Sequence, residues 1–276
     1  MTSEKRGPGF YVLTAFFVLF VLFLYGPLTT IFILSFQGPN GGLTFPMNGV
    51  SLRWFQNLLF EQQAVGDFGG AFTRSLVLGL MTMITTVVVS LLAGLAFRRR
   101  FLGSGPLFYL TIASLIVPSI LISLGIGLAF NVFGLEPAWY SSAFGGHLTW
   151  TLPFGLLIMF AVFNRFNPAY EEAARDLGAS PWQTFAHVVL PIILPSLIGV
   201  GLFGFTLSYD EFARTLMTAG TFNTLPLEIY GMTTNVTTPV LYALGTVTTL
   251  FSMAVILLAL VTIAVLRKRR ARRLAG

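Results

Sequence analysis

Acidic and histidine side chains are the residues of this chain that could do acid–base or metal chemistry. Two adjacent acid pairs and two histidines stand out: Glu171, Glu172, Asp210, Glu211, His147 and His187. Neighbours on a helix point about 100° apart, so Glu171 and Glu172 do not face each other as an acid–base pair would. The 276 residues include no cysteine, which excludes disulfides and thiolate chemistry. We therefore expect no catalytic residues, no metal site and no enzymatic activity on this chain.

Glycine patterns give no nucleotide site either. A G-x-G-x-x-G pattern covers residues 199–204, but it lies inside an apolar stretch and follows no strand, which indicates helix packing. The phosphate-binding pattern G-x-x-x-x-G-K-[ST] does not occur in the sequence. We expect no cofactor on the chain itself.

The composition is that of a membrane protein. Hydrophobic residues make up 55% of the chain and charged residues 9%, against about 25% charged residues in soluble domains. The apolar segments are long and lack the alternation of β-barrel strands. We predict an all-α, polytopic membrane protein that forms a single domain over residues 1–276.

Six apolar stretches are long enough, or nearly so, to cross a bilayer core, which takes roughly 20 residues. They cover residues 10–35, 71–97, 106–133, 147–163, 191–209 and 240–266. The fourth is at the short end of the range. The fifth begins with Pro191 and Pro195, which are tolerated in a first helical turn and kink a helix further in.

Charged residues predict the orientation. With the N-terminus inside, 13 of the 16 Lys and Arg fall on the inner side, and six of the ten acids fall outside. This asymmetry obeys the positive-inside rule and places both termini in the cytoplasm. It also explains the net charge of +6 without nucleic acid as a partner. The basic tail 267–276 is expected to contact anionic membrane lipid.

The inner loop 164–190 is predicted to form two short helices. Asn167 is a good N-cap for the first helix, and Gly178 would end it as the residue after the C-cap. Ser180 and Gln183 form an S-x-x-Q capping box that starts the second helix. The second helix then runs into the fifth apolar stretch.

The first of these helices has two notable surfaces. Glu171 and Arg175 are four residues apart and can pair. Ala173, Ala174 and Leu177 would form a small apolar face. From the residues alone, this loop is equally a hairpin on the membrane surface or a knob that docks into another protein.

A motif of fixed spacing runs through the loop. Its positions are Glu172-Ala173-Ala174, then Gly178, then Val188, Leu190 and Pro191. The pattern resembles the EAA loop of ABC importer permeases, with Val188 where that family has isoleucine. The resemblance implies the type I ABC importer permease fold with six transmembrane helices.

The resemblance also implies partners and a coupling site. Such a permease forms half of a translocation pathway beside a second, homologous permease. Two ATPase subunits would carry ATP and Mg, and a periplasmic binding protein would deliver the substrate. The residues expected to couple to an ATPase are Glu171, Glu172, Ala173, Ala174, Leu177, Gly178 and Ala179.

A second similarity concerns the substrate. Segments 208–212, 225–230 and 239–246 resemble the second permease of spermidine/putrescine importers, which implies a small cationic solute. Permeases for opines, other amines, phosphonates and iron have similar sequences and remain alternatives. Residues expected to line the pathway are Tyr209, Asp210, Glu211 and Phe212. The two acids could instead lie in outer water or pair with Arg214.

Other function classes fit less well. A membrane-embedded enzyme would need polar catalytic groups clustered near one interface, and the apolar stretches offer none. A channel or a secondary carrier would leave the EAA-like loop without a role.

Overall fold

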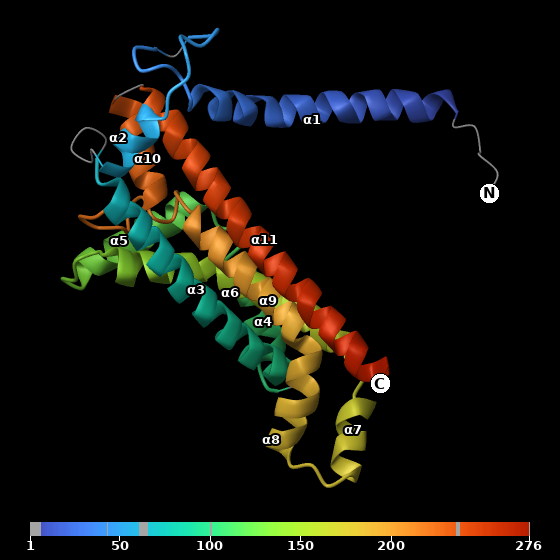
Figure 1. The fold of residues 1–276 in the computed structure, drawn as a ribbon. Helices are drawn as coiled ribbons and strands as arrows, with labels where there is room; N and C mark the ends of the chain where they lie inside the picture. The colour runs from blue at the N-terminus through green and yellow to red at the C-terminus, as the bar shows by residue number, and fades with distance from the viewer. Residues whose placement is uncertain (1–6, 43, 61–65, 100, 236–237, 276) are drawn as a thin grey trace. The chain divides into compact units, whose positions relative to one another are not determined.

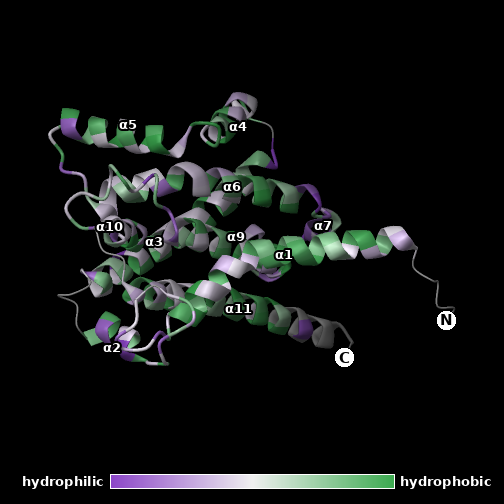
Figure 2. Cartoon of the chain, turned by 90° about the horizontal axis from the view of Figure 1, so that it is seen from above, coloured by the Kyte–Doolittle hydropathy of each residue, from purple (hydrophilic) through white to green (hydrophobic). Residues whose placement is uncertain are grey.

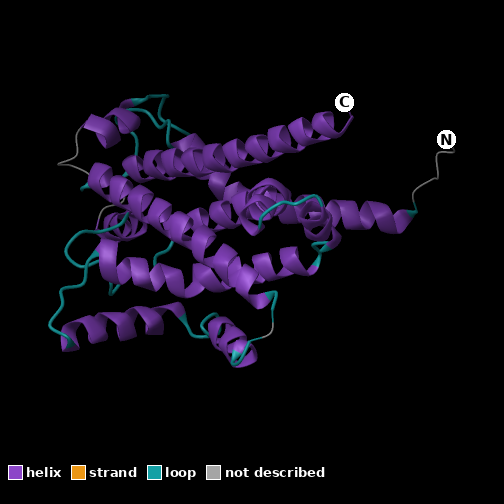
Figure 3. Cartoon of the chain, turned by 90° about the horizontal axis from the view of Figure 1, so that it is seen from below, coloured by secondary structure: helices purple, strands orange, loops and turns teal. Residues whose placement is uncertain are grey.

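A computed structural model describes residues 7–42, 44–60, 66–99, 101–235 and 238–275. Within these ranges the chain is helical, and its only β-type pairing is an isolated bridge between Gln37 and Val50 (Figure 3). Lys5, Arg6 and Arg100, which the charge analysis counted, lie outside the described residues. So do most side chains of the basic tail 267–276.

Among the described residues, five apolar helical segments are long enough to cross a membrane. Three are single helices, α1 (Pro8–Leu34), α3 (Phe68–Phe97) and α11 (Pro239–Ala275), the last apolar as far as Val265. The other two are compound. The π-helix η2 (Trp139–Ala143) extends α6 (Phe144–Asn164), and α8 (Pro181–Thr184) continues through η3 (Phe185–Val189) into α9 (Leu190–Tyr209). Five of the predicted stretches are confirmed, and the fourth is longer than expected.

The third predicted span, 106–133, is not one helix. It is divided into α4 (Ser104–Ala113) and α5 (Ser119–Val132). Pro118 separates them with an extended backbone, ψ 132°, because proline lacks an N–H and disfavours helix at the residue before it. At 14 residues, α5 is about 21 Å long, less than the roughly 30 Å of a bilayer core.

The chain forms two compact units. One holds residues 1–67 and 231–251, and the other holds residues 68–230 and 252–276. In the first unit α1 is apolar (Figure 2) and exposed along most of its length; Phe23 leaves 81% of its surface free. Such a helix suits a lipid environment or a partner subunit.

A buried glutamine organises the loop after α1. The Gln37 amide nitrogen donates to the carbonyls of Gly42 and Thr44, at 2.9 and 3.1 Å, and its oxygen accepts from the Asn48 N–H at 2.8 Å. The Trp54 indole N–H donates to the Gln37 carbonyl at 2.8 Å. Trp54 belongs to α2 (Arg53–Phe60), so these bonds tie this short helix to the end of α1.

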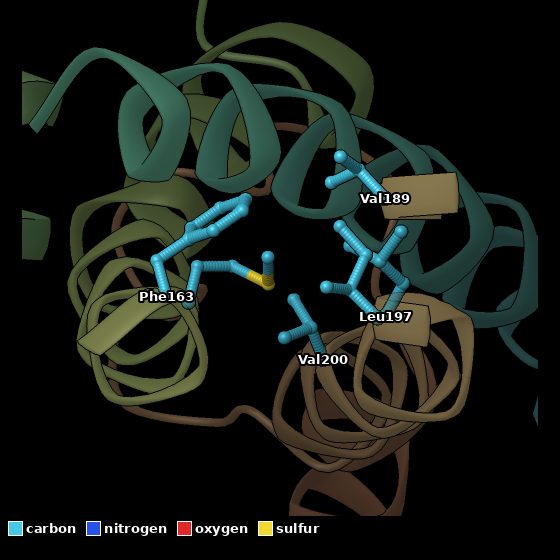
Figure 4. Close-up of a cluster of buried hydrophobic side chains, with 6 residues drawn as sticks. Phe163, Val189, Leu197 and Val200 are labelled. Atoms are coloured by element: carbon cyan, nitrogen blue, oxygen red, sulfur yellow. The ribbon is translucent and has the colours of Figure 1, made fainter. Parts of the chain in front are cut away.

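In the second unit, α3 packs against both α6 and α9. Toward the end of α3, six buried side chains of α6, η3 and α9 form a core: Met159, Phe163, Val189, Ile193, Leu197 and Val200. Figure 4 shows Phe163, Val189, Leu197 and Val200 converging on one space. Gly94 of α3 closes this core, since a Cβ there would lie 2.9 Å from Met159 Cβ.

Further along, small residues let α3, α6 and α9 approach one another closely. A Cβ on Gly155 of α6 would lie 2.1 Å from Ser90 Oγ and 2.9 Å from Thr86 Cγ2, both on α3. A Cβ on Gly204 of α9 would lie 3.3 Å from Thr86 Cβ. Thr86 Oγ1 also donates to Thr151 Oγ1 at 3.0 Å. Close backbone approach and hydrogen bonds of this kind hold helices together where lipid removes the hydrophobic drive.

We predict that Gly155→Ala destabilises the protein, because the added methyl must displace Thr86 and Ser90 of α3. Overpacking of this kind costs about 1–3 kcal/mol. Gly199→Ala is the matched control, since nothing lies within 4 Å of a Cβ there. Thermal unfolding in detergent should show a lower midpoint for Gly155→Ala alone. Equal midpoints for the two variants would contradict this packing.

Candidate functional site

Helix α7 (Ala169–Asp176) is the first element of the candidate coupling site. Asn167 Oδ1 accepts the Ala169 N–H at 3.0 Å, so Asn167 caps the helix start as predicted. Glu171 and Glu172 follow in the first turn, where the helix dipole stabilises negative charge.

The turn at Gly178 has the geometry expected of a helix end. Gly178 has φ +84°, which is open to glycine and strained for other residues. The Ala179 N–H donates to the Ala174 carbonyl at 3.0 Å, and the Gly178 N–H donates to the Arg175 carbonyl at 2.8 Å. This pair of bonds is a Schellman motif. The predicted glycine turn is confirmed.

The second helix starts with the predicted capping box. Ser180 Oγ accepts the Gln183 N–H at 3.3 Å, and Gln183 Oε1 accepts the Ser180 N–H at 2.8 Å. From Pro181 the helical segment continues to Tyr209. The loop is therefore joined to α9 without a flexible break.

The end of this hairpin exposes apolar side chains. Leu177 leaves 90% of its surface free, Trp182 71% and Tyr170 54%. Ala173 is exposed and Ala174 is half-buried. Sequence reasoning selected Leu177 and the alanines and missed both aromatic residues, although large apolar residues in an otherwise polar loop were a visible signal. In Figure 1, α7 and α8 lie side by side at the end of the second unit where α3 finishes.

The predicted partner of Glu171 was wrong. Glu171 forms its ion pair with Arg98, just beyond the end of α3, and not with Arg175. Arg98 Nη1 donates to Glu171 Oε1 at 2.9 Å and Nη2 to Oε2 at 2.5 Å. A two-bonded guanidinium–carboxylate pair is stronger than a surface pair along one helix. Hydrogen bonding to Arg98 lowers the pKa of the Glu171 carboxyl.

The expected pathway residues face different surroundings. Tyr209 ends α9 and is buried, with 2% of its surface exposed and its ring stacked on Phe205. Asp210 is exposed. The half-buried Phe212 ring lies 5.0 Å from the ring of Tyr230. These residues do not share one surface, and their pathway role stays a prediction.

Glu211 is engaged with Arg214, the alternative that the sequence left open. Glu211 Oε1 accepts the Arg214 N–H at 2.7 Å, and Oε2 lies 3.7 Å from Nη1. Arg214, 2% exposed, also donates from Nη1 to Ser119 Oγ at 2.7 Å and lies 4.5 Å above the ring of Trp150. The cluster therefore binds the turn after α9 to α5 and α6.

Sequence reasoning named His147 but did not predict its buried position beside this turn. His147 Nδ1 lies 2.7 Å from Ser208 Oγ, and Nε2 lies 2.9 Å from Thr215 Oγ1. Ser208 Oγ in turn donates to Thr82 Oγ1 at 3.2 Å. These bonds join α6, α9, α3 and the turn. A histidine inside an apolar stretch was the available signal, since such residues need polar partners.

Metal-binding residues do not gather in the described part of the chain. No group of three or more His, Cys, Asp or Glu side chains is placed to hold an ion there. The arrangement supports docking at the hairpin and polar contacts at the other end of α3.

Comparison with known proteins identifies relatives over most of the chain. Residues 86–272 match the family described as "Binding-protein-dependent transport system inner membrane component". The spermidine/putrescine transport system permease protein PotC of Haemophilus influenzae is 27% identical over 255 residues, which cover 91% of this chain and 95% of that protein. The putrescine transport system permease protein PotI of Escherichia coli is 26% identical over 232 residues, 81% of this chain and 80% of that one.

Solved structures share the fold. A chain of a bacterial ABC transporter involved in the import of the acidic polysaccharide alginate has a TM-score of 0.69 at 15% identity, with 92% of this chain and 94% of that chain covered. A chain of the MetNI methionine ABC transporter, in an inward-facing conformation, has a TM-score of 0.55 at 16% identity, with 75% and 98% covered. The predicted ABC importer permease fold is confirmed.

We predict that the two adjacent acids differ in their effect on stability. Glu211→Gln removes the charge opposite buried Arg214 and should lower the thermal unfolding midpoint, because breaking a buried pair costs about 3–5 kcal/mol. Asp210→Asn removes the same charge at an exposed position and should leave the midpoint unchanged. Similar midpoints for the two variants in detergent would contradict a structural role for Glu211.

Proposed function

The chain belongs to the family of binding-protein-dependent transport system inner membrane components, and we propose that it is a permease subunit of an ATP-driven importer for a polyamine such as putrescine or spermidine. Its family and its apolar helices make it a multi-pass inner-membrane protein. The named relatives are permeases, which are transport subunits and not enzymes.

The observation that carries this proposal is the hairpin of α7 and α8. Its two helices are capped and joined by a Schellman turn, and its end exposes Leu177 and Trp182. An exposed apolar surface on a polar loop favours a protein partner. We propose that this partner is one of two ATPase subunits, which hold ATP and Mg and contact residues 171–174 and 177–179.

The remaining partners complete the pathway. A second, homologous permease would supply its other half, and a periplasmic binding protein would deliver substrate on the outer side. Both termini would lie in the cytoplasm with the hairpin, as the basic residues of the inner loops favour. Closure of the ATPases would draw the hairpins together and rock the helices from inward-open to outward-open, a rigid-body transition.

The substrate class is supported by two independent observations. Relatives that cover most of the chain are named for spermidine and putrescine. Asp210, which directly follows α9, is an exposed acid, and its carboxylate can attract an organic cation. Glu211 and Tyr209 are buried, so we propose that they hold the backbone on either side of Asp210 in place and do not contact substrate. The alginate transporter shows that the fold also serves an acidic solute, so the substrate must be tested directly.

Uptake in proteoliposomes tests the function. We predict that this permease, reconstituted with its sister permease, ATPases and binding protein, imports radiolabelled putrescine or spermidine when ATP is present. This chain alone should import nothing. Uptake by the chain alone would favour a channel or a secondary carrier. ATP-dependent import of an opine, a phosphonate or iron in place of a polyamine would support the proposed importer but contradict the proposed polyamine substrate.

The same assay tests Asp210. We predict that Asp210→Asn reduces polyamine uptake about tenfold, the loss expected when a contact worth about 1.4 kcal/mol is removed. Glu136→Gln, which neutralises another exposed acid, should not change uptake. Equal uptake by both variants would remove Asp210 from the pathway.

Coupling through the hairpin is tested at its glycine turn. We predict that Gly178→Val strains the backbone, by about 1–3 kcal/mol, and abolishes substrate-stimulated ATP hydrolysis while membrane insertion persists. Gly103→Val is the matched control: Gly103 has φ +85° and lies before α4, outside the hairpin. Normal stimulation in Gly178→Val would contradict the coupling assignment.

A further inference from the structure

We propose that Arg98 is a positioning residue that fixes the angle of α7 against α3 and passes movement of the hairpin directly to α3. The inference rests on the proposed function for its transport consequences, but its structural part can be measured without transport. The sequence motif of the hairpin does not include Arg98, which lies 73 residues before Glu171.

Helix α7 packs against α8 and η3, the rest of its own hairpin, so its angle to α3 needs a further contact. None of its eight residues is buried, and a helix so short is not stable by itself. Its ends are joined covalently to α6 and α8, which leaves its angle to be set by side-chain contacts. Besides the Arg98–Glu171 pair, the described contacts include the rings of Phe166 and Tyr170, 6.2 Å apart.

Arg98 is itself held in place. Its guanidinium carbon lies 5.2 Å from the ring centre of Phe163 and 5.4 Å from that of Phe166, both on the segment that leads into α7. Contacts between a cation and ring faces are favourable and restrict the side chain. Hydrogen bonding to Glu171 raises the pKa of Arg98, as it lowers that of the carboxyl, so both groups keep their charge.

The pair borders an open space and not a packed core. A cavity of about 270 Å³ is lined by Leu95, Arg98, Arg99, Pro168, Glu171, Glu172 and Arg175. Because packed side chains do not fill this space, the two hydrogen bonds between Arg98 and Glu171 bridge it and hold α7 against the end of α3.

Helix α3 leads from the Arg98–Glu171 pair to the opposite end of the second unit. Its 30 residues extend about 45 Å. In its first half, Ser75 Oγ accepts the Leu225 N–H at 2.8 Å, and at its middle Thr82 Oγ1 accepts the Ser208 hydroxyl. Movement of the hairpin that displaces Arg98 would thus be transmitted along α3 to the segment after α9. This route is additional to the direct connection of the hairpin to α9.

Absence of cysteine from the chain permits a direct structural test. Spin labels at Leu92→Cys, on the exposed side of α3, and Asp176→Cys, on α7, report the angle between the helices in the complete complex with cysteine-free partner subunits. We predict that Arg98→Gln broadens the distance distribution by at least about twofold, because α7 loses its ion pair. Arg99→Gln, which removes the same charge one residue away, should leave it narrow. Equal widths for Arg98→Gln and the unmutated protein would overturn the inference.

The functional test uses substrate imported per ATP hydrolysed. Arg98→Gln should lower this ratio about fivefold, the loss expected for a contact worth about 1 kcal/mol, with basal ATP hydrolysis retained. Arg98→Glu and Glu171→Arg should each be impaired, and the double charge reversal should recover part of the ratio. An unchanged ratio in Arg98→Gln would refute the inference while the importer stands. If the unmutated complex imports nothing, the proposed function fails, and the spin-label distances still decide the role of Arg98.

Discussion

The close approach of α3 to α6 and α9 is the constraint on which the second unit depends. In lipid, apolar side chains gain little from leaving one apolar environment for another, so helices must gain contact through small residues and hydrogen bonds. Gly155 admits Ser90 and Thr86 of α3 at distances that a larger residue would prevent, and Gly204 faces Thr86 at a distance that leaves a Cβ a tight contact of 3.3 Å. The threonine and serine hydroxyls between these helices then form hydrogen bonds from one helix to another. Large side chains fill the space further along, around Met159, where Gly94 of α3 again permits a close approach.

The same polar chemistry orders the turn after α9. Backbone that is not helical at membrane depth must find partners within the protein. The Arg214 N–H has such a partner in the Glu211 carboxylate, and the side-chain hydroxyl of Thr215 in the same turn lies beside His147. The buried Arg214 guanidinium contacts a carboxylate, a hydroxyl and an indole. The cluster thereby leaves Asp210 as the acid that faces outward.

Local signals in the sequence predicted local structure well. The capping box at Ser180 and the glycine turn at Gly178 depend on a few neighbouring residues, and both are present. The division of 106–133 was missed because an apolar run reads as one span until Pro118 is given its full weight. The partner of Glu171 could not be read from spacing, because Arg98 is 73 residues away and meets it only through the packing of α3 against α6.

The hairpin combines a rigid internal structure with an exposed surface, as suits an element that docks into another protein. Caps at Asn167 and Ser180 and the turn at Gly178 fix the internal shape by local hydrogen bonds. Burial contributes little, since no residue of α7 is buried. The hairpin continues through η3 into α9, and the Arg98–Glu171 pair adds a contact with the end of α3. In the proposed role of Arg98, movement of the hairpin reaches α3, the helix that packs against both α6 and α9, as well as α9 itself.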